Sequence, residues 1–130
     1  MDTKYFEKIR IFDGGMGQEL LSKGLISKGT LWSASALIEK EFHELVIDAH
    51  MSYINAGADI IVTNNFSARK IRFIQNKVLD KFQYANEQAG ILANKAREIS
   101  KQNILIAGSL PSQSDTCLLY TSPSPRDITP

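Results

Sequence analysis

The chain has 130 residues, of which 43% are hydrophobic and 22% charged, and its formal net charge is +1. These values are ordinary for a globular domain, and a charge near zero provides neither the basic surface of a nucleic-acid-binding protein nor an acidic surface for cationic partners. No apolar run reaches the roughly 20 residues of a membrane-spanning helix, and the N-terminal residues lack the apolar core of a signal peptide. We therefore predict one domain at most, in the cytoplasm, with neither nucleic-acid nor membrane partners.

The first predicted strand, Ile9–Phe12, runs into a loop with three glycines, residues 13–17 (DGGMG). Glycines let backbone approach a ligand closely, although this loop lacks both the dinucleotide-binding spacing and the P-loop lysine. Asp13 is the informative residue, because a carboxylate at the carboxyl end of a strand can hold a substrate ammonium group. The same carboxylate could instead cap the following helix.

Three segments follow with different patterns. Gln18–Lys23 is predicted to be a short helix, and Leu25–Ala36, which holds Trp32 and small polar residues, is predicted to be a loop. From about Glu39 to Ala56 the apolar residues recur at helical spacing. Gly57 can then end this helix in the left-handed conformation.

The two histidines, His43 and His50, both fall within this predicted helix. Seven residues separate them, which is about 10 Å along a helix axis, so one metal ion cannot bind both. We predict core packing or hydrogen bonding for them.

The stretch AGADIIVTNNFSA, residues 56–68, contains the second predicted strand. Ile60–Val62 is an unbroken β-branched run, which favours a strand buried on both faces. Thr63 and Asn64 follow at its carboxyl end, where α/β proteins bind ligands. A turn in which these side chains bond their own backbone is the alternative.

A short helix with a loop is predicted over Ala68–Leu79, and a longer helix over about Lys81 to Lys101. Ile104–Ala107 is then a third buried strand, which opens into Gly108 and Ser109. Strand and helix alternate, which predicts an α/β fold with parallel strands joined by crossover helices.

Three segments together resemble the homocysteine S-methyltransferase family: IFDGGMGQEL (11–20), LWSASAL (31–37) with HMSYINAGADIIVTNNFSA (50–68), and ILIAGSLPSQSD (104–115). The resemblance implies a (β/α)₈ barrel, of which residues 1–116 supply about three βα units. It also implies a homocysteine pocket at the carboxyl ends of the strands. The substrate-binding residues expected there are Asp13, Gly14, Gly15, Thr63, Asn64, Phe66 and Ser109.

The family's reaction transfers a methyl group to the homocysteine sulfur and gives methionine. A zinc ion held by cysteine thiolates binds that sulfur, and a paired Gly-Gly-Cys-Cys motif supplies part of the site. This motif is absent here, and Cys117 is the single cysteine. We therefore expect no zinc site of that kind in this chain, no turnover by it alone, and no assignable catalytic residue. The methyl donor stays open among S-methylmethionine, S-adenosylmethionine, a betaine and a folate.

The last segment, residues 117–130, differs from the rest. Residues 117–127, CLLYTSPSPRD, resemble one reading frame of a sequencing-library adaptor. We predict that this tail is non-native or disordered.

Two other interpretations remain for the chain. One is another α/β-barrel or doubly wound enzyme that binds a phosphate-bearing ligand at the glycine loop. The other is a small non-catalytic α/β interaction domain.

Overall fold

The computed structural model describes residues 2–112, so the predictions for the tail lie outside the described residues. The helices and strands, in chain order, are α1 Met16–Ser22, α2 Ser35–Ile38, α3 His43–Asn55, β1 Ile60–Val62, α4 Lys70–Gln75, α5 Phe82–Ser100 and β2 Leu105–Ala107. Short 3₁₀ helices cover Thr3–Glu7, Trp32–Ala34, Lys40–Phe42 and Leu79–Lys81. No helix among the described residues is both long and apolar enough to cross a membrane.

Strands β1 and β2 are parallel neighbours, with Ile60 opposite Leu105. Phe12 forms an isolated parallel bridge to Ile60 on the other side of β1. The order in space is therefore the Phe12 segment, β1 and β2, which is also their order in the chain. The predicted parallel α/β arrangement is confirmed for this part.

The first predicted strand, Ile9–Phe12, is wrong in its extent, because only Phe12 makes a bridge. The amide of Ile11 donates to the side-chain Oδ2 of Asp59 at 2.9 Å and not to a backbone carbonyl. Ile9 is 94% exposed, so burial does not hold it against the sheet. A side chain thus occupies the place that a longer strand ladder would need.

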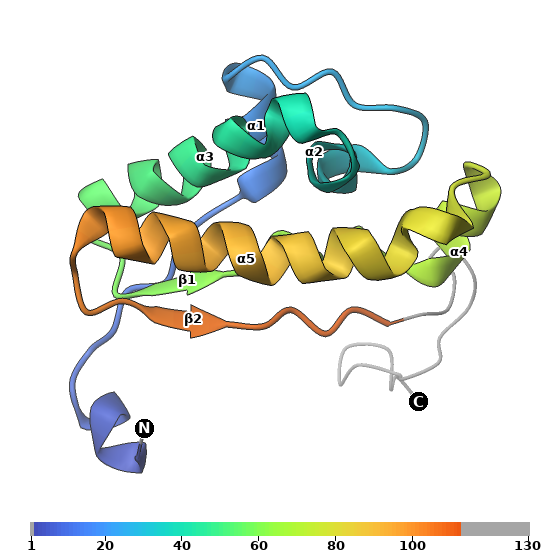
Figure 1. Ribbon diagram of the computed structural model, residues 1–130. Coiled ribbons are helices and arrows are strands. Elements are labelled where there is room, and N and C mark those ends of the chain that lie inside the picture. The colour runs from blue at the N-terminus through green and yellow to red at the C-terminus, as the bar shows by residue number, and fades with distance from the viewer. Residues whose placement is uncertain (1, 113–130) are drawn as a thin grey trace, which may run out of the picture.

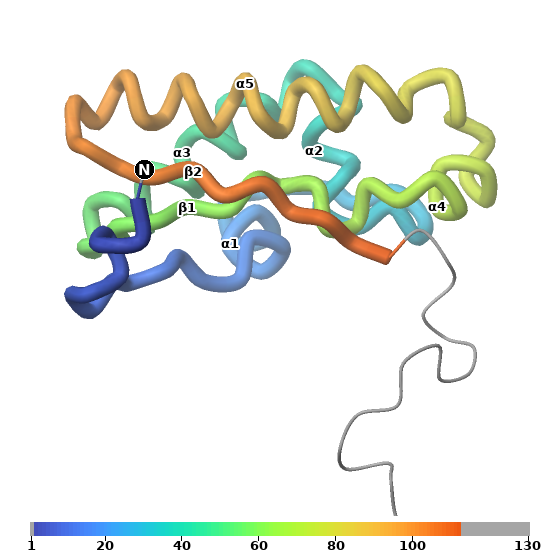
Figure 2. The backbone as a smooth tube through the Cα atoms, turned by 90° about the horizontal axis from the view of Figure 1, so that it is seen from below, coloured from blue at the N-terminus to red at the C-terminus, as the bar shows by residue number. Residues whose placement is uncertain are grey.

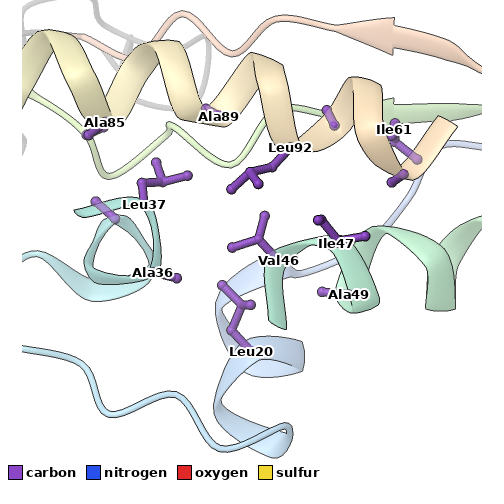
Figure 3. Close-up of a cluster of buried hydrophobic side chains, with 14 of the residues drawn as sticks. Leu20, Ala36, Leu37, Val46, Ile47, Ala49, Ile61, Ala85, Ala89 and Leu92 are labelled. Carbon is purple, nitrogen blue, oxygen red and sulfur yellow. The ribbon is translucent and has the colours of Figure 1, made fainter. Parts of the chain in front are cut away.

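Helices α3 and α5 cover one face of the strands, and α5 runs along their whole length (Figure 1). The core lies between these helices and the sheet, where Val46 of α3 faces Leu92 of α5 and Ile61 of β1 lies nearby (Figure 3). All three side chains are buried. Burial of such a side chain is worth about 1.5–3 kcal/mol, so this layer stabilises the edge from which the site projects.

The helices largely match their predicted positions. Gly57 ends α3 with φ +107°, as expected for a left-handed helix end. The predicted loop Leu25–Ala36 is wrong in its second half, where Trp32–Ala34 and α2 are helical. Leu37 of α2 is completely buried. Tertiary packing of this kind stabilises short helices that the local sequence pattern does not predict.

Candidate functional site

A pocket of about 280 Å³ opens where the Phe12 segment, β1 and β2 end. It is lined by Asp13, Gly14, Met16, Gly17, Trp32, Ser33, Val62, Thr63, Asn64, Phe66, Ser67 and Ser109. Six of the seven residues expected to bind substrate are in this wall, and Gly15 is not. We call it the Asp13 pocket. That these residues bind a substrate stays a prediction.

Asp13 is the acidic residue in this wall. Its Oδ2 accepts a hydrogen bond from the amide of Val62 at 2.9 Å, and its own amide donates to the carbonyl of Ile60 at 2.9 Å. Burial raises the pKa of Asp13 above its usual 3.8, while the backbone hydrogen bonds oppose that rise. The carboxylate is therefore oriented by the neighbouring strand and partly desolvated, which strengthens its attraction for a cation.

Tyr53 of α3 holds the glycine loop, residues 13–17, in place. The Tyr53 hydroxyl donates to the carbonyl of Gly15 at 3.0 Å. A Cβ on Gly14 would lie only 3.0 Å from the Tyr53 ring, so the ring and the loop are in close contact. Gly15 thus contributes through its carbonyl to the shape of the loop, a contact that spacing in the sequence could not reveal.

Thr63 joins the loops that follow β1 and β2. Its Oγ1 accepts a hydrogen bond from the amide of Ser109 at 3.0 Å and donates to Oδ1 of Asn65 at 2.7 Å. Asn65 Nδ2 in turn donates to the carbonyl of Ser109 at 3.1 Å and to Oδ1 of Asn86 at 3.0 Å. Thr63 therefore bonds across the sheet, whereas the alternative had it bonding its own backbone.

Asn64 holds a second connection. It is only 3% exposed, and its Nδ2 donates to the carbonyl of Ser33 at 3.2 Å. The hydroxyls of Ser33 and Ser67 are 2.9 Å apart, and the Ser67 hydroxyl also accepts from the amide of Ala34. These contacts attach the segment before α2, residues 29–34, to the loop after β1. Asn64 therefore positions one wall of the pocket.

Trp32, which lies in the segment predicted to be a loop, is 42% exposed in the pocket wall. Its φ is +53°, a left-handed conformation that costs a bulky residue energy and persists where surrounding contacts impose it. A Cβ on Gly17 would lie 2.2 Å from the indole Nε1, so the ring packs directly on that glycine. Together with Phe66, which is 70% exposed, Trp32 forms an aromatic wall.

The two histidines have the roles predicted for them. A ring nitrogen of His43, Nε2, lies 2.8 Å from the carbonyl of Leu37, and His50 is fully buried in the core. Residues 2–112 contain no group of three or more His, Cys, Asp or Glu side chains that could hold a metal ion.

The family model described as homocysteine S-methyltransferase matches residues 10–129. The chain belongs to this family. It is 33% identical over 115 residues to the homocysteine S-methyltransferase of Escherichia coli (strain K12), an alignment that covers 80% of this chain and 35% of that protein. It is 41% identical over 58 residues to homocysteine S-methyltransferase 1 of Arabidopsis thaliana, covering 45% of this chain and 17% of that protein.

The fold of this chain resembles that of a solved structure. The crystal structure of the homocysteine methyltransferase MmuM from Escherichia coli, in its metallated form, matches with a TM-score of 0.71 and 30% sequence identity. The match covers 84% of this chain and 40% of that one. The chain thus spans about a third of the length of the E. coli relative, and the metal named for MmuM is a property of that protein.

Proposed function

We propose that this chain is the homocysteine-binding part of an S-methyltransferase that converts homocysteine into methionine. The Asp13 pocket carries the proposal, because an oriented, partly buried carboxylate stands at the carboxyl ends of three parallel segments. Family membership supports homocysteine as the substrate. The cytoplasm is the proposed location.

We also propose that residues 1–116 are the first part of a (β/α)₈ barrel. The Phe12 segment, β1 and β2 are adjacent in chain order, with α3 and α5 as the connections between them. This is the arrangement of successive βα units, and active sites of such barrels lie at the carboxyl ends of the strands. The position of the Asp13 pocket agrees with that rule.

In the proposed complex, the Asp13 carboxylate binds the ammonium group of homocysteine. The Val62 amide holds Oδ2 in place, so little side-chain entropy is lost when the ligand binds. The Thr63–Ser109 hydrogen bond holds the opposite side of the pocket in the same way. These residues bind and orient the amino-acid part, which positions the sulfur for reaction.

The reaction itself forms a bond between the homocysteine sulfur and the methyl carbon. The bond from that carbon to the donor breaks, its electron pair stays with the donor, and the thiol proton is lost before or during transfer. We propose zinc for the complete enzyme, where it would favour the thiolate form of the sulfur. The described residues do not fit such a site, since none of residues 2–112 is a cysteine and no group of potential ligands is present among them.

The test measures binding of L-homocysteine to the 130-residue chain by isothermal titration calorimetry. Asp13→Asn should weaken binding about 10- to 100-fold, the range expected for a charge-assisted hydrogen bond. Asp48→Asn is the matched control, because Asp48 is exposed on α3 and outside the pocket.

A second ligand sharpens this experiment. 4-Mercaptobutyrate keeps the thiol and the carboxylate of homocysteine but lacks the ammonium group. Its affinity should not change in Asp13→Asn, because the contact that the variant removes is with the ammonium. Equal homocysteine affinity in Asp13→Asn and Asp48→Asn would refute the proposed role of Asp13.

A further inference from the structure

A second pocket adjoins the first and contains two arginines. This arginine pocket has a volume of about 360 Å³ and is lined by Thr30, Trp32, Phe66, Ser67, Arg69 and Arg72. Three of these residues, Trp32, Phe66 and Ser67, also line the Asp13 pocket. The aromatic wall is therefore common to both cavities.

The arginine pocket is held between two segments that are far apart in the sequence. The side chain of Asn76, just after α4, donates from Nδ2 to the Thr30 hydroxyl at 2.7 Å and to the carbonyl of Arg72 at 2.7 Å. A Cβ on Gly29, whose φ is +53°, would lie 2.2 Å from Asn76 Oδ1. The segment before α2 thus lies directly beside α4, as the tube in Figure 2 also shows.

The charges of the two pockets are opposite. The arginine pocket has two guanidinium groups and no carboxylate among its lining residues, whereas the Asp13 pocket has one carboxylate and no cationic side chain. Arg69 is only 5% exposed, and Arg72 is partly buried. A guanidinium offers a planar array of donors that matches a carboxylate, and partial burial strengthens such a pair.

We propose that the arginine pocket is a carboxylate subsite that binds the acidic end of the methyl donor. This inference rests on the proposed function, since a methyl transfer needs two ligands side by side. A donor anchored at Arg72 extends along Trp32 and Phe66, the wall that borders the Asp13 pocket. The aromatic faces suit the positively charged methyl-bearing centre of a sulfonium or ammonium donor.

The proposed subsite predicts which methyl donors the chain binds. A donor with a free carboxylate is accepted, and the same donor with that carboxylate converted to an amide is disfavoured. Homocysteine itself is held by Asp13 through its ammonium group, so its affinity does not depend on Arg72.

The test uses nuclear magnetic resonance on the isotopically labelled 130-residue chain. Trp32 is the single tryptophan, so its indole N–H gives one unambiguous signal in the shared wall. S-methylmethionine should shift this signal, and Arg72→Gln should raise the dissociation constant about tenfold or more. S-methylmethionine amide should bind the unmodified chain about as weakly as S-methylmethionine binds Arg72→Gln.

Lys77→Gln is the matched control, because it removes one positive charge close to α4 from an exposed residue outside both pockets. Arg72 is the better residue to change, since Arg69 is almost fully buried and its loss would disturb the fold. Equal donor affinity in Arg72→Gln and Lys77→Gln would overturn the proposal. So would a loss of homocysteine affinity in Arg72→Gln with donor affinity intact.

The two proposals fail separately in this experiment. If homocysteine does not bind but S-methylmethionine binds through Arg72, the carboxylate subsite stands and the assignment of the Asp13 pocket falls. If homocysteine binds through Asp13 and the affinity for S-methylmethionine does not depend on Arg72, the assignment of the Asp13 pocket stands and the carboxylate subsite falls.

Discussion

His50 provides a test of the core that does not depend on any ligand. The side chain is 0% exposed, and both ring nitrogens are without a hydrogen-bond partner among the described residues. Burial lowers its pKa from 6.5 to about 4, since the charged ring would be poorly solvated there. Above pH 6.5 the ring is neutral in both states. Between pH 6.5 and 4 the unfolded chain binds a proton that the folded chain does not, so stability falls as the pH falls.

The size of this effect follows from the shift. A difference of 2.5 pKa units, taken at 1.36 kcal/mol per unit, gives a loss of about 3 kcal/mol in the free energy of unfolding by pH 4. His50→Leu removes the titrating group and two unpartnered buried nitrogens. It should therefore be more stable than the unmodified chain at pH 7 by about 1–3 kcal/mol, and by about 3 kcal/mol more at pH 4.

Urea unfolding at a series of pH values between 7.5 and 4 measures this difference, because carboxylates shared by both proteins cancel in the comparison. His43→Leu, which removes the only other histidine, serves as the control. The reasoning is refuted if the stability difference between His50→Leu and the unmodified chain stays constant across this pH range.

Three further changes test the site. Gly17→Ala should displace the Trp32 indole, shift its fluorescence and cost about 1–3 kcal/mol of stability, because the new Cβ would lie 2.2 Å from Nε1. Gly15→Ala, where nothing lies within 4 Å of the new Cβ, should leave the fluorescence unchanged. Thr63→Val should lose about 0.5–3 kcal/mol in urea unfolding and weaken homocysteine binding, since it removes both hydrogen bonds of Oγ1; unchanged values would contradict the bridging role. Homocysteine affinity should fall as the pH drops through the raised pKa of Asp13, and calorimetry of Asp13→Asn should show no such step.

Strand β1 and the long helices were predictable because their signals are local. The prediction that Ile104–Ala107 is a buried strand is wrong in its burial, because all three residues of β2 are only partly buried. Ile60–Val62 is an unbroken β-branched run, and the apolar stripe that predicted a helix over about Lys81 to Lys101 became α5. The error at Ile9–Phe12 has a different origin. Its apolar residues suit a strand, but the amide of Ile11 donates to the side chain of Asp59. A local sequence pattern cannot predict a contact with a residue 48 positions away.

The candidate site divides along the same line. Asp13, Thr63 and Ser109 follow predicted strands directly, so topology alone brings them to one edge of the sheet. Trp32 comes from a segment expected to be a loop, and it reaches the pocket only through tertiary contacts such as the Ser33–Ser67 pair. Sequence position therefore identified the residues at the strand ends, and the family resemblance added Phe66, but no pattern in the sequence indicated that Trp32 lines the pocket.

The same contacts explain how two pockets of opposite charge can lie side by side at the carboxyl ends of the strands. Each strand end contributes short polar side chains whose hydrogen bonds join neighbouring loops, as Thr63 does with Ser109. The segment before α2 is attached separately, through Asn64 to Ser33 and through Asn76 to Thr30. Because it is anchored at both places, it stands as a fixed partition over the strand ends. A partition held by the protein's own hydrogen bonds does not have to be ordered by a ligand, so both pockets are formed before anything binds.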